Sequence, residues 1–253
     1  MSSQQRAARI HGAQLDHLAF GLARLEDAPA TLVGLLGGAT HEGGPNLEFT
    51  GGQWEFERGA RIEVIVPNEH PNGFMKRFIE TRGPGIHHVT FKVPDIYAAR
   101  EHAEAMGYTV TGFNDRYEAW KEMFLHPRSA HGIVVQLAQS HPDIPDEGWT
   151  RDFAFPRYDG AAPPRADVLG LRLRVHDERN AAKLWGELLG GRCEQNPAGD
   201  IYRWADSALR IRVRVDRSDA EGPEAVEVAA VRAGALGAGG AEAMGSRFEP
   251  VAR

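Results

Sequence analysis

Residues 85–96 read GIHHVTFKVPDI, and the pattern in this stretch occurs three times along the chain. The other two copies are LDHLAFGLARLED at residues 15–27 and LGLRLRVHD at residues 169–177. Each copy alternates apolar with other residues, as a half-buried strand does, and then gives way to the acidic or polar start of a helix. The chain is therefore built on an internal repeat, and this repeat decides the fold.

The size and charge of the chain narrow its class. It has 253 residues, 42% of them hydrophobic, which is enough for one large or two small domains. Its net charge of −6 provides no basic field for nucleic acid or anionic lipid. The single cysteine excludes an intramolecular disulfide framework, and the sequence contains no apolar run typical of a signal or membrane segment. We therefore expect a cytoplasmic protein with neither nucleic acid nor membrane as a partner.

The pattern of residues 1–140 predicts an α+β fold made of two βαβββ modules. For the first module we expect a helix at 28–36 and strands at 15–21, 46–50, 53–57 and 61–66. A short helix at 72–80 connects it to the second module, for which we expect a helix at 95–105 and strands at 86–93, 109–113, 119–126 and 132–138.

The remaining chain is predicted to hold a third, degenerate module. A Pro-rich linker at 141–166 precedes it, and a Gly/Ala-rich tail at 233–253 follows it. Within the module, residues 167–232, we expect a helix at 180–189 and strands at 169–175, 201–205, 208–215 and 225–231.

Four polar residues occupy two pairs of equivalent positions in the first two modules. His17 and His88 lie at the same place in the first strand, beside small residues that leave room for a ligand. Glu63 and Gln136 interrupt the apolar run of the last strand, at nearly the same separation in sequence from the respective histidines. Two imidazoles, a carboxylate and an amide oxygen are suitable ligands for a divalent ion such as Zn, Ni, Co, Mn or Fe. The spacing predicts a metal site.

Each of these four residues also has an ordinary explanation by itself. A single histidine in a strand is more often a hydrogen-bonded structural residue, a glutamate can be a strand-edge charge, and a glutamine can be a satisfied core amide. Their joint occurrence at equivalent positions favours the metal site, because four separate burials would otherwise need four explanations.

Two further motifs carry a family resemblance. Residues 74–80 read FMKRFIE and lead into the repeat at 85–96, and residues 124–137 read FLHPRSAHGIVVQL. With these motifs, residues 1–140 resemble the vicinal oxygen chelate superfamily, which includes glyoxalase I, bleomycin-resistance proteins, methylmalonyl-CoA epimerases and extradiol dioxygenases. The similarity is greatest to the epimerases. The resemblance implies that the two modules form a metal-binding cleft whose ligands are His17, Glu63, His88 and Gln136.

The chain departs from the epimerase pattern at one point. In those enzymes the second module supplies the glutamate ligand and the first supplies the glutamine, whereas Glu63 and Gln136 are the reverse. A pseudo-two-fold relation between the modules would leave the ligand set unchanged. The resemblance implies an epimerase, isomerase or glyoxalase-type lyase that removes a proton next to the carbonyl of an acyl-CoA or a similar small compound. Glu63 is the candidate catalytic base.

Other residues are candidates for contact with the substrate. In the strand before Glu63, these are Gln53 and Trp54, although a tryptophan is more often part of a core. The loop before the strand of Gln136 could hold an anionic group, although a solvated turn explains it equally well. The candidates in this loop are His126, Arg128, Ser129 and His131.

Two other functions remain open. The set His17, His88 and Glu63 is also the ligand set of a non-haem iron ring-cleaving dioxygenase. A resistance-type protein that only binds a small molecule would need no metal.

The third module keeps the strand pattern but lacks the ligands. Gly170 stands at the histidine position and Arg212 at the carboxylate position. We expect this module to pack against its symmetry mate in a homodimer, or to cover the cleft of its own chain. One face of its strands then needs acidic partners or water, because it carries Arg172, Arg174, Arg210, Arg212 and Arg214.

Overall fold

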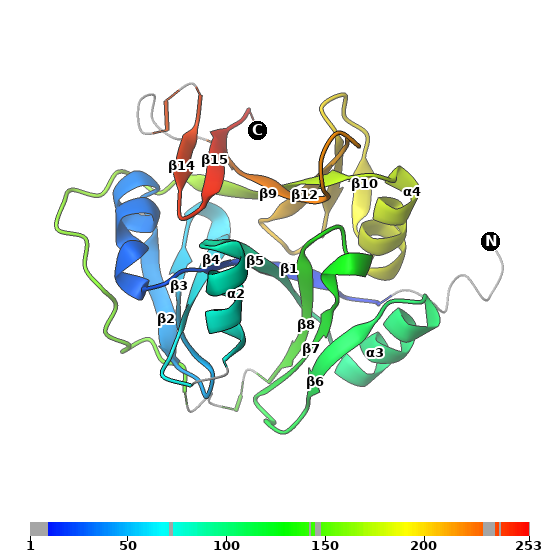
Figure 1. Ribbon diagram of the computed structural model, residues 1–253, viewed down its shortest axis with the longest axis horizontal. Coiled ribbons are helices and arrows are strands. Elements are labelled where there is room, and N and C mark those ends of the chain that lie inside the picture. The colour runs from blue at the N-terminus through cyan, green and yellow to red at the C-terminus, as the bar shows by residue number, and fades with distance from the viewer. Residues whose placement is uncertain are drawn as a thin grey trace. The chain divides into compact units, whose positions relative to one another are not determined.

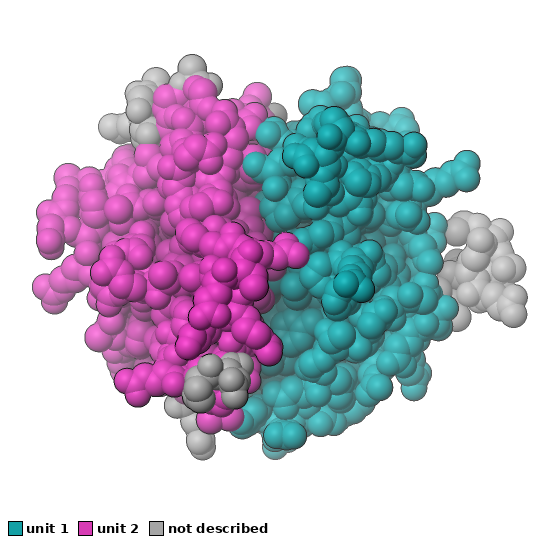
Figure 2. All heavy atoms as spheres, in the orientation of Figure 1, with its two compact units in different colours: residues 1–16, 88–145, 171–224 teal, residues 17–87, 146–170, 225–253 magenta. Residues whose placement is uncertain are grey.

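The structure, a computed structural model, describes residues 10–70, 73–141, 143–144, 148–229, 236–237 and 239–252. The chain divides into two compact units, each made of three separate stretches (Figure 2). Unit 1 comprises residues 1–16, 88–145 and 171–224, and unit 2 comprises residues 17–87, 146–170 and 225–253. Four details of the sequence predictions lie outside the described residues: the first residue of the connecting helix, two prolines of the linker, the end of the last strand, and the first part of the tail.

The first module has the order strand, helical segment and three strands (Figure 1). Its strands follow the order β2-β3-β4-β1, and β4 runs parallel to β1. Its elements are β1 (Gln14–Gly21), η1 (Leu25–Asp27), η2 (Ala30–Leu35), β2 (Ala39–Pro45), β3 (Phe49–Glu55), η3 (Glu57–Gly59) and β4 (Arg61–Pro67).

The second module follows the connecting helix α2 (Phe74–Arg82) and repeats this order (Figure 1). Its strands follow the order β5-β8-β7-β6, and α3 lies against β6, β7 and β8. Its elements are β5 (Gly85–Lys92), α3 (Ile96–Ala105), β6 (Val110–Asn114), β7 (Trp120–Leu125), η4 (Pro127–Ser129) and β8 (Val134–Ser140). In the described part of the chain, no helix has the length and apolar character needed to cross a membrane.

The acidic residue at the start of α3 explains where this helix begins. The side chain of Asp95 accepts hydrogen bonds from the backbone N–H groups of Tyr97 and Ala98 at 2.9 and 3.1 Å. Such a cap satisfies amides that have no partner within the helix and contributes about 0.5–2 kcal/mol. The acidic helix start predicted from the repeat is confirmed here.

The two modules also share their strand register. In each, the first strand pairs in parallel with the last strand. Ala19, two residues after His17, is opposite Glu63, and Thr90, two residues after His88, is opposite Gln136. The prediction of two consecutive βαβββ modules in the first 140 residues is therefore confirmed.

The strands expected at 46–50 and 53–57 were placed wrongly. Gly51 and Gly52, which separate these two expected strands, lie inside β3, and β2 begins at Ala39. A Cβ atom at Gly52 would lie 2.5 Å from the ring of Phe155, and one at Gly51 would lie 2.9 Å from the ring of Trp149. Aromatic rings from a distant segment thus occupy the space that side chains of β3 would otherwise fill.

That segment, residues 148–155, belongs to the expected linker, and we call it the strap. The backbone of Thr150 exchanges two hydrogen bonds with that of Gly43 in β2, with N···O distances of 2.9 and 3.0 Å. The ring of Phe155 packs edge to face on Trp54, with 5.0 Å between the ring centroids. Within unit 2, the strap therefore packs against β2 and β3.

The C-terminal half adds further strands to both units. Strands β10, β11 and β12 pair in antiparallel fashion, and β13 pairs in parallel with β15. The expected tail thus contains two strands. The elements are β9 (Asp167–Val175), α4 (Glu178–Ala181), η5 (Ala182–Leu188), β10 (Arg192–Glu194), β11 (Asp200–Arg203), β12 (Arg210–Val215), β13 (Gly222–Ala229), β14 (Ala241–Ala243) and β15 (Ser246–Pro250).

Each unit buries an aromatic residue of a first strand against the C-terminal half. In unit 2, Phe20 stacks on Phe248, with ring centroids 5.8 Å apart. In unit 1, the equivalent residue Phe91 meets Trp204 edge to face at 4.9 Å and stacks on Trp185 at 6.2 Å. Burying such a side chain contributes about 1.5–3 kcal/mol. The C-terminal half is consequently part of both cores.

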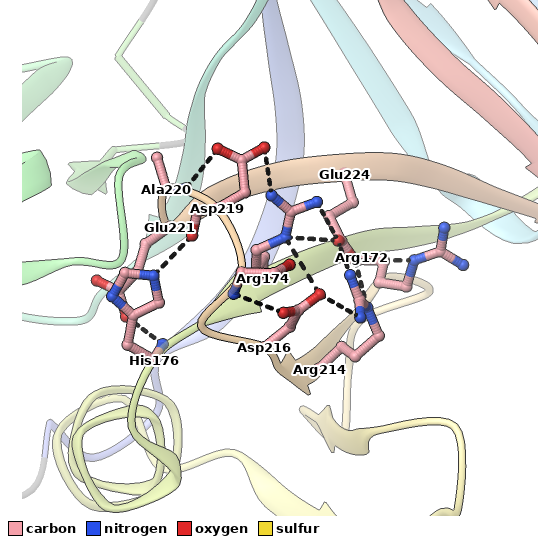
Figure 3. Close-up of polar contacts among 10 residues, drawn as sticks. Arg172, Arg174, His176, Arg214, Asp216, Asp219, Ala220, Glu221 and Glu224 are labelled. Atoms are coloured by element: carbon pink, nitrogen blue, oxygen red, sulfur yellow. Dashed lines mark hydrogen bonds and ion pairs between the residues drawn. The ribbon is translucent and has the colours of Figure 1, made fainter.

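Part of the arginine-lined face of the C-terminal half has acidic partners within unit 1 (Figure 3). Arg174 Nη1 lies 2.9 Å from Oδ2 of Asp219, and Arg172 Nε lies 3.3 Å from Oε2 of Glu224. Arg214 Nη1 lies 2.7 Å from Oδ2 of Asp216, and the same guanidinium contacts Glu224. These three arginines therefore need no partner subunit to balance their charge. We call this group the arginine network: Arg172, Arg174, Arg214, Asp216, Asp219 and Glu224.

Candidate metal centre

In unit 2, an imidazole and a carboxylate lie in direct contact on adjacent strands. Nε2 of His17, on β1, lies 2.6 Å from Oε2 of Glu63, on β4. The two residues are 1% and 7% exposed. A buried carboxylate is costly unless it is paired or bound to a metal, so the contact must offset the loss of hydration.

Gln53 is the neighbour of Glu63 on the other side. It lies directly opposite Glu63 in the ladder of β3 and β4, and its Nε2 donates to Oε2 of Glu63 at 3.4 Å. Arg61 Nη1 donates to Oε1 of Gln53 at 3.4 Å. Gln53, a predicted substrate contact, is therefore buried and hydrogen-bonded to Glu63.

In unit 1, an amide occupies the position that corresponds to Glu63. Thr90 Oγ1, on β5, donates to Oε1 of Gln136, on β8, at 2.6 Å. Nε2 of Gln136 donates to Oε2 of Glu122, on β7, at 2.6 Å. Trp120 Nε1 donates to the same carboxylate oxygen at 3.0 Å. His88, two residues before Thr90 on β5, is 5% exposed.

Glu122 is the residue that sequence reasoning missed. Gln53 stands directly opposite Glu63, but Glu122 stands opposite Ala138, two residues along the ladder from Gln136. Equal spacing between the modules could therefore not have found it. In the sequence, the available signal was the position of Glu122 as a charged residue within the half-buried strand β7.

Two of the predicted substrate contacts, Trp54 and His131, are buried. Trp54 is fully buried against Phe155, and strand alternation points it away from the face that carries Gln53. His131 is 4% exposed, its Nδ1 lies 3.1 Å from Oε1 of Glu221, and its ring lies 6.5 Å from that of Trp185. Both residues have contacts within the protein core.

The remaining loop candidates lie around the short helix η4. His126 caps this helix, since its Nδ1 accepts from the backbone N–H of Arg128 at 3.2 Å. Ser129 Oγ donates to the backbone oxygen of His126 at 3.0 Å. Arg128 is exposed, so its guanidinium remains accessible to an anion.

The environment of Glu63 includes a second histidine that is held neutral. Burial lowers the pKa of His87 to about 4; the charge of Glu63 opposes this shift, and that of Arg82 adds to it. The ring of His87 lies edge to face with Phe78, with centroids 4.7 Å apart, and 5.5 Å from the ring of Phe74. An uncharged imidazole therefore lies within electrostatic range of the carboxylate of Glu63.

Known proteins resemble this chain in sequence and in fold. Residues 16–124 match the model of the Glyoxalase/Bleomycin resistance protein/Dioxygenase superfamily. Over 139 residues, the chain is 31% identical to the ethylmalonyl-CoA/methylmalonyl-CoA epimerase of Cereibacter sphaeroides, an alignment that covers 50% of this chain and 97% of that protein.

Two solved structures are also similar. A triple mutant of 4-hydroxymandelate synthase from Streptomyces coelicolor superimposes with a TM-score of 0.58 at 14% identity, over 86% of this chain and 71% of that one. Methylmalonyl-CoA epimerase from Mycobacterium tuberculosis gives a TM-score of 0.46 at 24% identity, over 51% and 89%. The first of these establishes a shared fold over most of the chain. On the match to the family model and to the curated epimerase, the chain belongs to the glyoxalase/bleomycin resistance protein/dioxygenase superfamily.

Proposed function

We propose that this protein is a divalent-metal-dependent enzyme that removes a proton from the carbon next to a carbonyl group. In this proposal one ion is held by His17, Glu63 and His88, which form a candidate metal-binding group among the described residues, with Gln136 as the fourth ligand. The observation that carries the proposal is the buried contact of 2.6 Å between Nε2 of His17 and Oε2 of Glu63. The other two ligands occupy the repeat-equivalent positions and are 5% and 7% exposed.

The donor set suits a divalent ion. It combines two imidazole nitrogens, one carboxylate and one amide oxygen, which fit Zn, Ni, Co, Mn or Fe. A bound cation would also offset the cost of burying Glu63, which is 7% exposed. A divalent ion at this site supplies a Lewis acid for the negative charge that develops on the carbonyl oxygen.

Glu63 is proposed as the base. Its carboxylate accepts a hydrogen bond from Gln53 through Oε2, the oxygen that also contacts His17, so its orientation is fixed before a substrate arrives. A base held in this way removes the proton without rearranging its own surroundings. Return of the proton from Glu63 to a neighbouring atom gives an isomer, whereas an epimer forms when a second acid delivers a proton to the opposite face of the enediolate.

We propose an acyl thioester, of the acyl-CoA class, as the substrate. The support is the similarity to the curated ethylmalonyl-CoA/methylmalonyl-CoA epimerase. The C–H bond next to a thioester carbonyl is acidic enough for a carboxylate base assisted by a cation. Arg128, exposed on the loop before β8, is the proposed contact for an anionic group of this substrate, together with His126 and Ser129; His131, buried beside Glu221, is not part of this proposal.

Deuterium exchange tests this function. The purified protein, loaded with Co²⁺ or Zn²⁺, is incubated in D₂O with a panel of branched acyl-CoA thioesters and α-hydroxy carbonyl compounds, and the products are analysed by mass spectrometry. Incorporation of one deuterium, abolished by a chelator and restored by the ion, supports the proposal. Metal binding without exchange on any compound in the panel would contradict it.

A ring-cleaving or related oxygenase is the second candidate. Two histidines and one carboxylate, the set formed by His17, His88 and Glu63, are the ligands that non-haem iron oxygenases use. Stoichiometric oxygen uptake with a catechol or an aromatic 2-oxo acid under Fe²⁺, without solvent deuterium entering the acyl-CoA panel, would favour this candidate over the first.

We also propose that the protein is a cytoplasmic homodimer. Because the arginine network has its own carboxylates, the dimer does not depend on these charges. Light scattering of the full chain measures the mass, and cell fractionation measures the location. A monomer across the working concentration range would contradict the dimer.

A further inference from the structure

The carboxamide of Gln136 has a partner at each end. Thr90 Oγ1 donates to its oxygen at 2.6 Å, and its nitrogen donates to Oε2 of Glu122 at 2.6 Å. Gln136 is 7% exposed and Thr90 is 0% exposed. Both hydrogen bonds are therefore largely shielded from bulk water.

The two partners differ in how they act on the amide. A hydroxyl group both donates and accepts, so Thr90 can bond to either end of the carboxamide. A carboxylate only accepts, so Glu122 takes the nitrogen end alone. If the amide of Gln136 were rotated by 180°, its oxygen would face the carboxylate oxygen of Glu122, and both atoms are acceptors. The buried hydrogen bond between the two residues would then be lost, which is costly. Glu122 is therefore the partner that decides which way Gln136 points.

The orientation decides whether Gln136 can bind an ion. Only the oxygen of a carboxamide coordinates a hard or borderline cation, and it has two lone pairs, of which Thr90 takes one. We infer that Glu122 is a positioning residue that presents Oε1 of Gln136 to the metal, an inference that rests on the metal ligands proposed above. Residues next to the ligands of metal sites commonly orient them in this way.

The first module contains the same pair with the roles exchanged. There Gln53 Nε2 donates to Glu63, and the carboxylate is the proposed ligand. In the second module Gln136 is the proposed ligand, and the carboxylate of Glu122 is its neighbour. Each module therefore keeps one carboxamide and one carboxylate, and the reversal of Glu63 and Gln136 is matched by a glutamate on the strand next to Gln136.

The carboxylate of Glu122 is itself held in place. Trp120 Nε1 donates to Oε2, the same oxygen that accepts from Gln136. The ammonium group of Lys92 lies 3.8 Å from the centre of the Trp120 ring. The indole of Trp120 thus contacts Glu122 through Nε1 and Lys92 through its ring face. These contacts restrict the position of Oε2 of Glu122, which accepts from Gln136.

Metal affinity tests the inference without an assay of activity. Co²⁺ is titrated into the apo-protein and followed by its visible absorption, for the wild type, Gln136→Ala, Glu122→Gln, Glu122→Asp and the double variant Glu122→Gln/Gln136→Ala. Glu118→Gln, at an exposed position before β7, is the matched control, and Trp120→Phe removes the indole donor alone. Far-UV circular dichroism and urea unfolding of each apo-variant report folding.

We expect Glu122→Gln to weaken Co²⁺ binding at least about 10-fold, because an amide can bond to either end of Gln136. Glu122→Asp should recover part of the affinity, the control Glu118→Gln should match the wild type, and Trp120→Phe should weaken binding less than Glu122→Gln does. Glu122→Gln should have no further effect in the Gln136→Ala background. Wild-type affinity of a folded Glu122→Gln, with Gln136→Ala weakened, overturns the inference but leaves the proposed ligands intact. If Gln136→Ala binds Co²⁺ with wild-type affinity, Gln136 is not a metal ligand, and the inference about Glu122 is overturned as well. A loss that persists in the double variant makes Glu122 a ligand in its own right, which also overturns the positioning role.

Discussion

Nε2 of His17 and Oε2 of Glu63 lie 2.6 Å apart on adjacent parallel strands, with both side chains buried. We expect His17→Ala to lose most of the bound metal, because the remaining ligands are too few to hold a borderline cation tightly. The metal content measured by elemental analysis should fall from about one ion per chain to well below ~0.2 ions per chain. His88→Ala should behave alike, whereas His70→Ala, at an exposed position, should keep the wild-type content. Wild-type metal content in both His17→Ala and His88→Ala would contradict the proposed metal site.

The proposed base gives a different signature. Glu63→Gln should keep part of the metal, since an amide oxygen can still coordinate, but it cannot accept a proton. We expect solvent deuterium exchange to slow by about 10²–10⁴-fold while Co²⁺ binding weakens far less. Glu57→Gln, exposed between β3 and β4, is the control. An exchange rate that falls only in proportion to bound metal would show that Glu63 is a ligand and not the base.

The arginine network predicts a pH-dependent contribution to stability. Burial alone would raise the pKa of Glu224, but the hydrogen bonds from Arg214 and Arg174 and the charges of Arg214 and Arg172 together lower it below 4.5. A lowered pKa means that this stabilisation is complete above pH 4.5 and is lost as the pH falls through the lower, folded-state value. The difference in free energy of unfolding between wild type and Glu224→Gln should therefore be largest near pH 7 and shrink below about pH 4.5.

Urea unfolding between pH 7 and pH 3 measures this difference. Added salt should reduce it at pH 7, because exposed parts of the network are screened. Glu187→Gln, at an exposed position of η5, should show little dependence on pH. A constant difference between wild type and Glu224→Gln across this range would contradict the role assigned to the network.

The strap predicts an unusual sensitivity at one glycine. A Cβ atom at Gly44 would lie 1.7 Å from the backbone oxygen of Gly148, so Gly44→Ala must displace the strap from β2. We expect a loss of about 1–3 kcal/mol in the free energy of unfolding. At Gly186, in η5, the nearest atom would be the Tyr202 ring at 3.5 Å, so Gly186→Ala should be neutral or stabilising by up to ~1 kcal/mol. Equal effects of both substitutions on the urea midpoint would contradict the packing of the strap.

The sequence by itself determined the repeat and the residues that the repeat makes equivalent. Alternation with a period of two and helix caps such as Asp95 are local signals, so the module order could be read from neighbouring residues. The pairs His17 with His88 and Glu63 with Gln136 followed from the same signals, because they occupy the same places in equivalent strands.

The tertiary structure decided what depends on residues far apart in the chain. Gly51 and Gly52 became part of a strand because Trp149 and Phe155 cover them, which overrides the turn preference of glycine. Glu122 contacts Gln136 from a position two residues along the ladder of β7 and β8, whereas Gln53 lies directly opposite Glu63 in the ladder of β3 and β4. Local patterns fix the type of each element, but register and packing partners are fixed only when distant segments compete for the same space.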